Sequence, residues 1–175
     1  MSIADLEVRR MYELVLRDAR DSDAAGLIEL IGSVFREYPN CVLDVDGELP
    51  ELRHIASSFA EWRGRFWVAE RQRRIVGCVG CTPSAEPGGL ELKKLYVAES
   101  ERVSGLGSRL VTLVEQEARV RRARFIDLWS DTRFVTAHRF YERRGYQHGG
   151  VTRELHDKSD TVEGYFKKAI QLGRT

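Results

Sequence analysis

The chain has 175 residues, about the length of one domain, and 42% of them are hydrophobic and 31% charged. Its formal net charge of +1 gives no reason to expect a nucleic-acid partner. No apolar run approaches the ~20 residues of a membrane span, the N-terminus has no signal-peptide core, and three cysteines are too few for a disulfide framework, so we expect a cytoplasmic protein with no membrane partner.

The first part of the chain predicts a strand followed by two helices. Residues 12–21 alternate apolar and polar side chains, which is typical of a strand. After Asp21 the spacing becomes helical, and one apolar stripe is formed by Ala24, Leu27, Ile28, Ile31, Val34 and Phe35. A second helix is expected to begin near Pro50. We expect residues 1–175 to form a single domain, with residues 1–10 as a flexible N-terminal extension.

The rest of the chain predicts six more strands and two helices. The expected order is strand 65–70, turn 71–74, strand 75–84, strand 90–98, helix 106–118, strand 125–130, helix 135–144, strand 145–155 and strand 162–170. A helical crossover joins 90–98 to 125–130, so these two strands should be parallel. The sequence therefore predicts an α/β (α+β) fold with a mixed sheet and helices on both faces.

Two glycines stand between a strand and a helix in "ERVSGLGSRL", residues 101–110. The first backbone N–H groups of a helix have no internal partner, and glycine lets an anion approach them closely. A plain turn and a dinucleotide-binding loop are the alternatives to a phosphate-binding loop. A P-loop would need Lys after Gly107, where the sequence has Ser108. A Rossmann loop would need a third glycine and an acidic residue ~20 positions later.

A third pattern matches this loop and a later segment. "RVSGLG" (102–107) fits Arg/Gln-x-x-Gly-x-Gly/Ala, and so resembles the coenzyme A pyrophosphate loop of the GNAT superfamily of N-acetyltransferases. "AHRFYERRGY" (137–146) is similar to a later helix of that family, which carries a tyrosine. The resemblance implies a GNAT-like, mostly antiparallel sheet whose central parallel strands splay apart around the coenzyme.

The resemblance also implies a function and a cosubstrate. We expect direct transfer of an acetyl group from acetyl-CoA to a primary amine in a ternary complex, with no metal. The acceptor would be a small-molecule amine or a peptide or protein amine, and the enzyme a monomer or homodimer. A catalytically inactive CoA-binding regulatory or interaction module is the alternative, and a phosphate-binding fold without acyl chemistry is a third.

The donor site implied by the resemblance consists of backbone groups from the loop and the preceding strand. An N–H near Leu95 or Tyr96 would polarise the thioester carbonyl, and the pantetheine arm would pair with Leu95 and Val97. The pyrophosphate would bind the backbone of Arg102, Val103, Ser104, Gly105, Leu106, Gly107 and Ser108. One departure is Phe134, which stands where the family often has an asparagine seven residues before the tyrosine.

Two side chains are expected to move protons. Tyr141 matches the family tyrosine that protonates the departing thiolate, although it could instead be a core aromatic residue. Glu91 occupies the position of a base in some family members. In an unbroken strand Glu91, Lys93, Leu95 and Val97 share one face, and a bulge would change this. Glu91 could instead be an exposed strand carboxylate paired with Lys93 or Lys94. In that case water or another carboxylate would serve as the base.

The acceptor pocket is expected from residues 36–62 and 146–166. The first segment carries carboxylates that could attract an ammonium group or simply be solvated, namely Glu37, Asp44, Asp46, Glu48 and Glu51. Cys78 and Cys81 are three apart in a strand and should point to opposite faces, which argues against a metal site. His138 lies three residues before Tyr141 and could orient it, although a surface histidine is the simpler interpretation.

Overall fold

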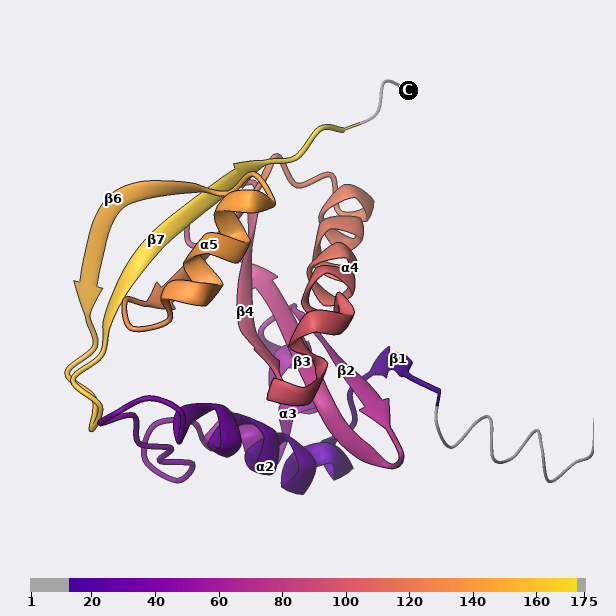
Figure 1. Cartoon of the computed structure of the whole chain (residues 1–175). Helices are drawn as coiled ribbons and strands as arrows, with labels where there is room; N and C mark the ends of the chain where they lie inside the picture. The colour runs from indigo at the N-terminus through magenta and orange to yellow at the C-terminus, as the bar shows by residue number, and fades with distance from the viewer. Residues whose placement is uncertain (1–12, 173–175) are drawn as a thin grey trace, which may run out of the picture.

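A seven-stranded sheet with helices on both faces makes up residues 13–172, the part of the chain that the computed structural model describes (Figure 1). The strands are β1 (Val15–Asp18), β2 (Arg65–Arg71), β3 (Arg74–Pro83), β4 (Gly89–Val97), β5 (Phe125–Asp131), β6 (Gln147–Glu154) and β7 (Val162–Ala169). The helices are α2 (Ala24–Phe35), α3 (Ile55–Glu61), α4 (Leu106–Val120) and α5 (Val135–Arg143). This is the order of elements that the sequence predicts, and residues 1–10 lie outside the described residues.

The strands lie in the order β1-β2-β3-β4-β5-β7-β6, and within this sheet only β4 and β5 run parallel. Their pairing begins at Gly89 and Phe125 and ends at Leu92 and Leu128, although both strands continue beyond these residues. The two strands therefore diverge toward their carboxyl ends. The expected mixed, mostly antiparallel sheet with a splayed parallel pair is confirmed.

Two apolar cores hold the helices against the sheet. On one face, residues such as Leu27, Ile55 and Phe59 of α2 and α3 pack on Val68 and Cys78. On the other face, the apolar stripe of α4 packs on β3, β4 and β5, together with Tyr141 of α5. Cys78 and Cys81 belong to different cores, as the strand geometry predicts, and Cys41, Cys78 and Cys81 are all free.

Two helical segments differ from the prediction. The expected second helix is split into a 3-10 turn, Pro50–Arg53, and α3, because the backbone leaves the helical region at His54 with φ −142°. A 3-10 turn, Glu99–Ser104, also precedes α4 where only a loop was expected. Within residues 13–172, no helix combines the length and apolar character needed to cross a bilayer.

The β6–β7 hairpin curves away from the other strands, and its connecting loop meets the segment that follows α2 (Figure 1). The backbone N–H of Val42 donates to the hydroxyl of Ser159 at 2.8 Å, and the N–H of Lys158 donates to Glu48 at 2.7 Å. Lys158 also forms an ion pair with Asp44. These contacts join segments more than 100 residues apart and define one rim of the site described next.

Candidate functional site

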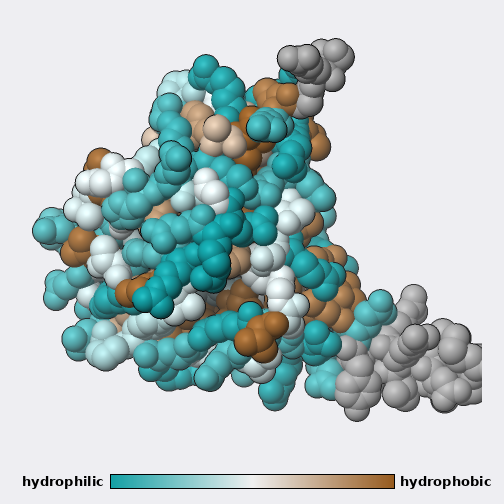
Figure 2. Space-filling model, turned by 45° about the horizontal axis from the view of Figure 1, so that its top comes forward, coloured by the Kyte–Doolittle hydropathy of each residue, from teal (hydrophilic) through white to brown (hydrophobic). Residues whose placement is uncertain are grey.

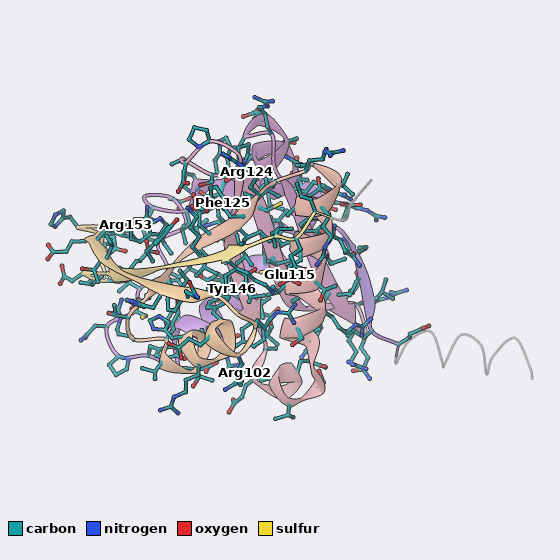
Figure 3. All side chains as sticks on the ribbon, turned by 90° about the horizontal axis from the view of Figure 1, so that it is seen from above. Arg102, Glu115, Arg124, Phe125, Tyr146 and Arg153 are labelled. Atoms are coloured by element: carbon teal, nitrogen blue, oxygen red, sulfur yellow. The ribbon has the colours of Figure 1, made fainter. Side chains whose placement is uncertain are left out.

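A cleft of about 800 Å³ opens where β4 and β5 diverge. Its walls come from the ends of these two strands, from α5, from the segment 41–51 and from the β6–β7 hairpin. Seen from above, Arg102 lies at the lower edge of the molecule beside the start of α4, and Arg153 of β6 lies at its left edge (Figure 3). The molecular face in Figure 2 is mostly hydrophilic, with its apolar residues in separate groups.

A bulge in β4 determines which side chains face the cleft. Lys93 pairs with Gly80 and Tyr96 with Cys78, so Lys94 and Leu95 together oppose one residue of β3. The backbone of Lys94 has a φ of +53°, which residues other than glycine rarely adopt and which is typical of a bulge. This residue lines the cleft and pairs with Glu51 at 2.7 Å.

The bulge also decides which face of the sheet the later side chains of β4 occupy. Glu91 lies on the α2–α3 face, and Tyr96 packs into the core on that face. Leu95 and Val97 pack against the opposite core, beside α4. The common face that an unbroken strand would give to Glu91, Lys93, Leu95 and Val97 is therefore absent, because β4 has the bulge that was left open as the alternative, and its extra residue reverses the alternation after Lys93.

The glycine loop forms an open helix start next to β4. Gly105 has a φ of +79°, a conformation that favours glycine, and α4 begins at Leu106. No side chain caps this helix, and its first turn contains no acidic residue. The N–H groups of Leu106, Gly107 and Ser108 therefore lack intrahelical partners and suit an anion.

Arg102 fixes the position of this loop. Its guanidinium forms two hydrogen bonds with Glu37, both at 2.6 Å, and a third with the carbonyl of Val97 at 3.2 Å. The first pair of bonds raises the pKa of Arg102. The neighbouring Val103 side chain, by contrast, is 98% exposed. The structure thus brings together the loop, the end of β4 and the end of α2.

Tyr141 is both a core residue and a cleft residue. It is 5% exposed, and its ring lies 5.5–5.9 Å from those of Phe140, Tyr146 and Phe166. It also lines the cleft, and its hydroxyl makes no hydrogen bond with any of residues 13–172. Burial raises the pKa of this hydroxyl, so Tyr141 is neutral and can donate a proton.

His138 differs from the simpler interpretation of the sequence. Its side chain is partly buried, and its ring centroid lies 4.9 Å from that of Phe166. The Nε2 atom is buried and has no hydrogen-bond partner among the described residues. His138 is therefore not a surface histidine, and it makes no hydrogen bond with Tyr141.

Glu91 lies in the cleft wall, in an ion pair. Its side chain is 16% exposed, and Lys93 donates to its Oε1 at 2.6 Å. The ion pair considered as an alternative is thus present, but it is inside the cleft rather than on an exposed surface. Glu91 also lies opposite Asp127 in the parallel register of β4 and β5.

Asp127 is a residue that sequence reasoning missed. It is 5% exposed, and its Oδ2 accepts hydrogen bonds from Ser84 at 2.7 Å and Tyr165 at 3.1 Å. Its Oδ1 is buried without a partner among the described residues. Burial raises the pKa of Asp127, and the nearby charge of Glu91 raises it further. A carboxylate inside the apolar run "FIDLWS" was the available signal.

The acidic segment after α2 is held against the rest of the protein by most of its carboxylates. Four of its five carboxylates bind distant parts of the protein: Glu37 binds Arg102, Asp44 and Glu48 bind Lys158, and Glu51 binds Lys94. These contacts dock the segment onto β4, the glycine loop and the β6–β7 hairpin. Asp46 is exposed and pairs with Arg53 of the same segment. Within residues 13–172, no three His, Cys, Asp or Glu side chains form a group that could hold a metal ion.

Comparisons with known proteins agree with this architecture. Residues 10–146 match the model of the Acetyltransferase (GNAT) family. N-acetyltransferase 8B of Rattus norvegicus is 32% identical over 126 residues, which are 69% of this chain and 54% of that protein. This chain spans about half the length of the curated relatives it matches.

Solved structures share the fold. A GNAT acetyltransferase from Staphylococcus aureus superposes with a TM-score of 0.77 at 22% identity, over 91% of this chain and 100% of that one. An acetyltransferase from Salmonella typhimurium, solved with its cofactor acetyl-CoA, gives a TM-score of 0.68 at 13% identity, over 93% and 97% of the two chains. At these identities the likeness concerns the fold alone, and it agrees with the fold class expected from the sequence.

Proposed function

Because the chain belongs to the GNAT family of acetyltransferases, we propose that it is an N-acetyltransferase that uses acetyl-CoA and acetylates a primary amine by direct transfer in a ternary complex. The observation that carries this proposal is the uncapped start of α4 beside the end of β4, where β4 has diverged from β5, together with the Tyr141 side chain in the cleft between the two strands. The proposal includes a cytoplasmic location and a monomeric or homodimeric enzyme, as the sequence predicts.

The residues at the donor end fit a coenzyme. The backbone from Arg102 to Ser108 would hold the pyrophosphate, because the free N–H groups there face no competing carboxylate in the first turn of α4. Beyond Leu92, the side of β4 toward β5 has no strand partner, so the backbone of Leu95 and Val97 is free to pair with the pantetheine amides. An N–H near Leu95 or Tyr96 would hydrogen-bond the carbonyl of the thioester. When bound, acetyl-CoA supplies the activated acetyl group.

Two side chains of the cleft can take up and supply protons during the reaction. An ammonium cannot attack a carbonyl, so Glu91 takes the proton that the acceptor nitrogen loses. Tyr141 donates its hydroxyl proton to the departing sulfur, and the buried ring holds the hydroxyl in place. The bond between the acetyl carbon and sulfur breaks as the bond to nitrogen forms. The ammonium gives its first proton to Glu91, which passes it to solvent. The second proton of the nitrogen is lost as the amide forms and replaces the one that Tyr141 gave to the sulfur, so the net reaction releases one proton.

The charge of the cleft favours an amine as the acceptor. Six carboxylates but only four cationic side chains line it. The carboxylates are Glu48, Glu51, Glu91, Asp131, Asp157 and Glu163. An excess of negative charge concentrates cations, and an amine in neutral solution is mostly an ammonium ion. We therefore expect the acceptor to be a small-molecule amine or the amine of a peptide or protein.

Two measurements test the proposal. Isothermal titration should show that the purified chain binds acetyl-CoA. A thiol-release assay with acetyl-CoA should show turnover with at least one member of a panel containing an alkylamine, a diamine, an amino acid and a lysine-containing peptide. Binding without turnover would favour an inactive coenzyme-binding module, and a chain that does not bind acetyl-CoA would refute both functions.

A further inference from the structure

Asp127 differs from the other buried carboxylates in residues 13–172. Six Asp and Glu side chains are buried there, and five of them form ion pairs with Arg or Lys. Those five are Asp23, Glu101, Glu115, Glu117 and Asp131. Asp127 has only neutral hydrogen-bond donors, the hydroxyls of Ser84 and Tyr165. A buried carboxylate without a cationic partner is costly, and such a group is a candidate for function.

The charged groups around Asp127 do not neutralise it. On β7, the ammonium group of Lys167 is bound to Glu86 and lies over the ring of Phe125, 3.9 Å from its centroid. The charge of Lys167 lowers the pKa of Asp127, but burial, the two hydroxyl hydrogen bonds and the negative charge of Glu91 all have larger effects on that pKa. The net pKa of Asp127 is raised.

The register of the parallel strands places Asp127 directly beside Glu91. The two are partners in the β4–β5 ladder, one position before the strands diverge. Their neighbours Leu92 and Leu128 belong to the core beside α4, so both carboxylates point to the opposite face of the sheet. Adjacent strands are about 4.8 Å apart, which makes the two side chains neighbours. Glu91 lines the cleft and Asp127 does not.

The unpartnered Oδ1 of Asp127 is a hydrogen-bond acceptor that lacks a donor. A carboxylate has no proton to donate, so Glu91 cannot fill that role while it is ionised. Once Glu91 has taken a proton, its carboxyl group becomes an O–H donor. The missing donor therefore appears at the same step in which a base would deprotonate the acceptor.

We propose that Asp127 is a positioning residue for Glu91, and that its Oδ1 accepts a hydrogen bond from Glu91 after Glu91 has removed the proton of the acceptor ammonium. One proton moves from nitrogen to Glu91, and the pair then carries one negative charge fewer until the proton returns to solvent. Asp127 thereby stabilises the protonated form of Glu91 through this hydrogen bond. This inference rests on the proposed function.

The first test is the pH profile of kcat/KM for Asp127→Asn, with acetyl-CoA and the panel amine that the wild type acetylates fastest. The asparagine keeps an oxygen for Ser84 and Tyr165 but presents an amide donor to Glu91. We expect the acid limb to move to lower pH and kcat at neutral pH to fall about 10-fold or more, with the KM for acetyl-CoA unchanged. Because the same amine is used throughout, its own titration cancels. An acid limb at the wild-type position would overturn the proposal.

The second test needs no acceptor, so it separates this inference from the proposed function. The pKa of Asp127 is raised in the folded state. Its contribution to stability therefore falls as the pH rises above about 3.9, the pKa of an aspartate in the unfolded chain. Asp127→Asn should therefore have a higher denaturant midpoint than the wild type at neutral pH, and this advantage should shrink in acid.

The matched control for this second test is Glu117→Gln. Glu117 is a buried carboxylate that bonds Arg65 and Arg121, and these bonds outweigh burial and lower its pKa. The control should therefore lose stability at neutral pH and keep the wild-type pH profile of kcat/KM. A lower midpoint for Asp127→Asn at neutral pH would show that Asp127 is an ordinary structural carboxylate and would overturn the proposal.

Discussion

Replacing Tyr141 by phenylalanine removes one hydroxyl and leaves the ring in place. The ring packs against Phe140, Tyr146 and Phe166 at centroid distances of 5.5, 5.7 and 5.9 Å, and phenylalanine can keep all three contacts. The hydroxyl bonds none of residues 13–172, so the change breaks no hydrogen bond within them. We therefore expect the free energy of unfolding to change by no more than about 1 kcal/mol.

The expected loss is catalytic. A general acid contributes about 10²–10⁴-fold, so kcat for Tyr141→Phe should fall by at least about 100-fold, which corresponds to about 2.7 kcal/mol of activation free energy. The dissociation constant of acetyl-CoA should stay within about twofold, because the hydroxyl is remote from the backbone groups that would hold the pyrophosphate. Single-turnover thiol release and isothermal titration measure the two quantities.

Tyr146→Phe is the matched control, because it removes the same atom from a neighbouring ring. The Tyr146 hydroxyl is buried and has no partner among the described residues. Deleting it should leave kcat unchanged and raise the free energy of unfolding by about 1 kcal/mol. If Tyr141→Phe retained the wild-type rate in a chemistry-limited turnover, Tyr141 would be a core residue only. Equal losses in both variants would point to a packing defect instead of a lost acid.

Other changes test the base, the donor loop and the fold. Glu91→Gln should lower kcat about 100-fold near neutral pH and recover partly at high pH, where more of the amine is free; a wild-type rate at neutral pH would remove Glu91 from the mechanism. Gly107→Glu should abolish acetyl-CoA binding in calorimetry, while Gly107→Gln, which adds similar bulk without charge, should bind acetyl-CoA more tightly than Gly107→Glu. Gly105→Glu should also abolish binding, and the positive φ at this position adds backbone strain. Asp23→Asn should lower the free energy of unfolding by about 2 kcal/mol at neutral pH, because the hydrogen bonds from Arg17 outweigh burial and lower the pKa of Asp23. This stabilisation is present above about pH 4 and is lost as the pH falls further, so the denaturation curves of the variant and the wild type should converge in acid.

Local patterns were enough to predict most of the fold. The apolar stripe of α4 repeats every three to four residues, and β2 and β3 are two runs of strand-forming residues on either side of a short polar turn. Each of these patterns is complete within about a dozen residues. The parallel relation of β4 and β5 follows from the helix between them. The glycine loop and Tyr141 were found because each belongs to a short contiguous motif.

The features that were missed depend on residues far apart in the chain. A lysine at positive φ, as at Lys94, has no sequence signature, so the bulge that turns β4 was left open as an alternative. The burial of Asp127 depends on Ser84 and Tyr165, about 40 residues to either side. Likewise, the pairing of the acidic segment with Lys158 could not be derived from local composition.

The place of β7 in the sheet bears on the synthesis of the protein. β7 fills the position between β5 and β6, yet it is translated after both of them. At 5–20 residues per second, the roughly 40 residues from the end of β5 to the end of β7 take a few seconds to make. During that time the apolar strand β5 presents a free edge, which is a template for pairing with other chains. We therefore expect the nascent polypeptide to be most prone to aggregation, and most dependent on chaperones, in this interval.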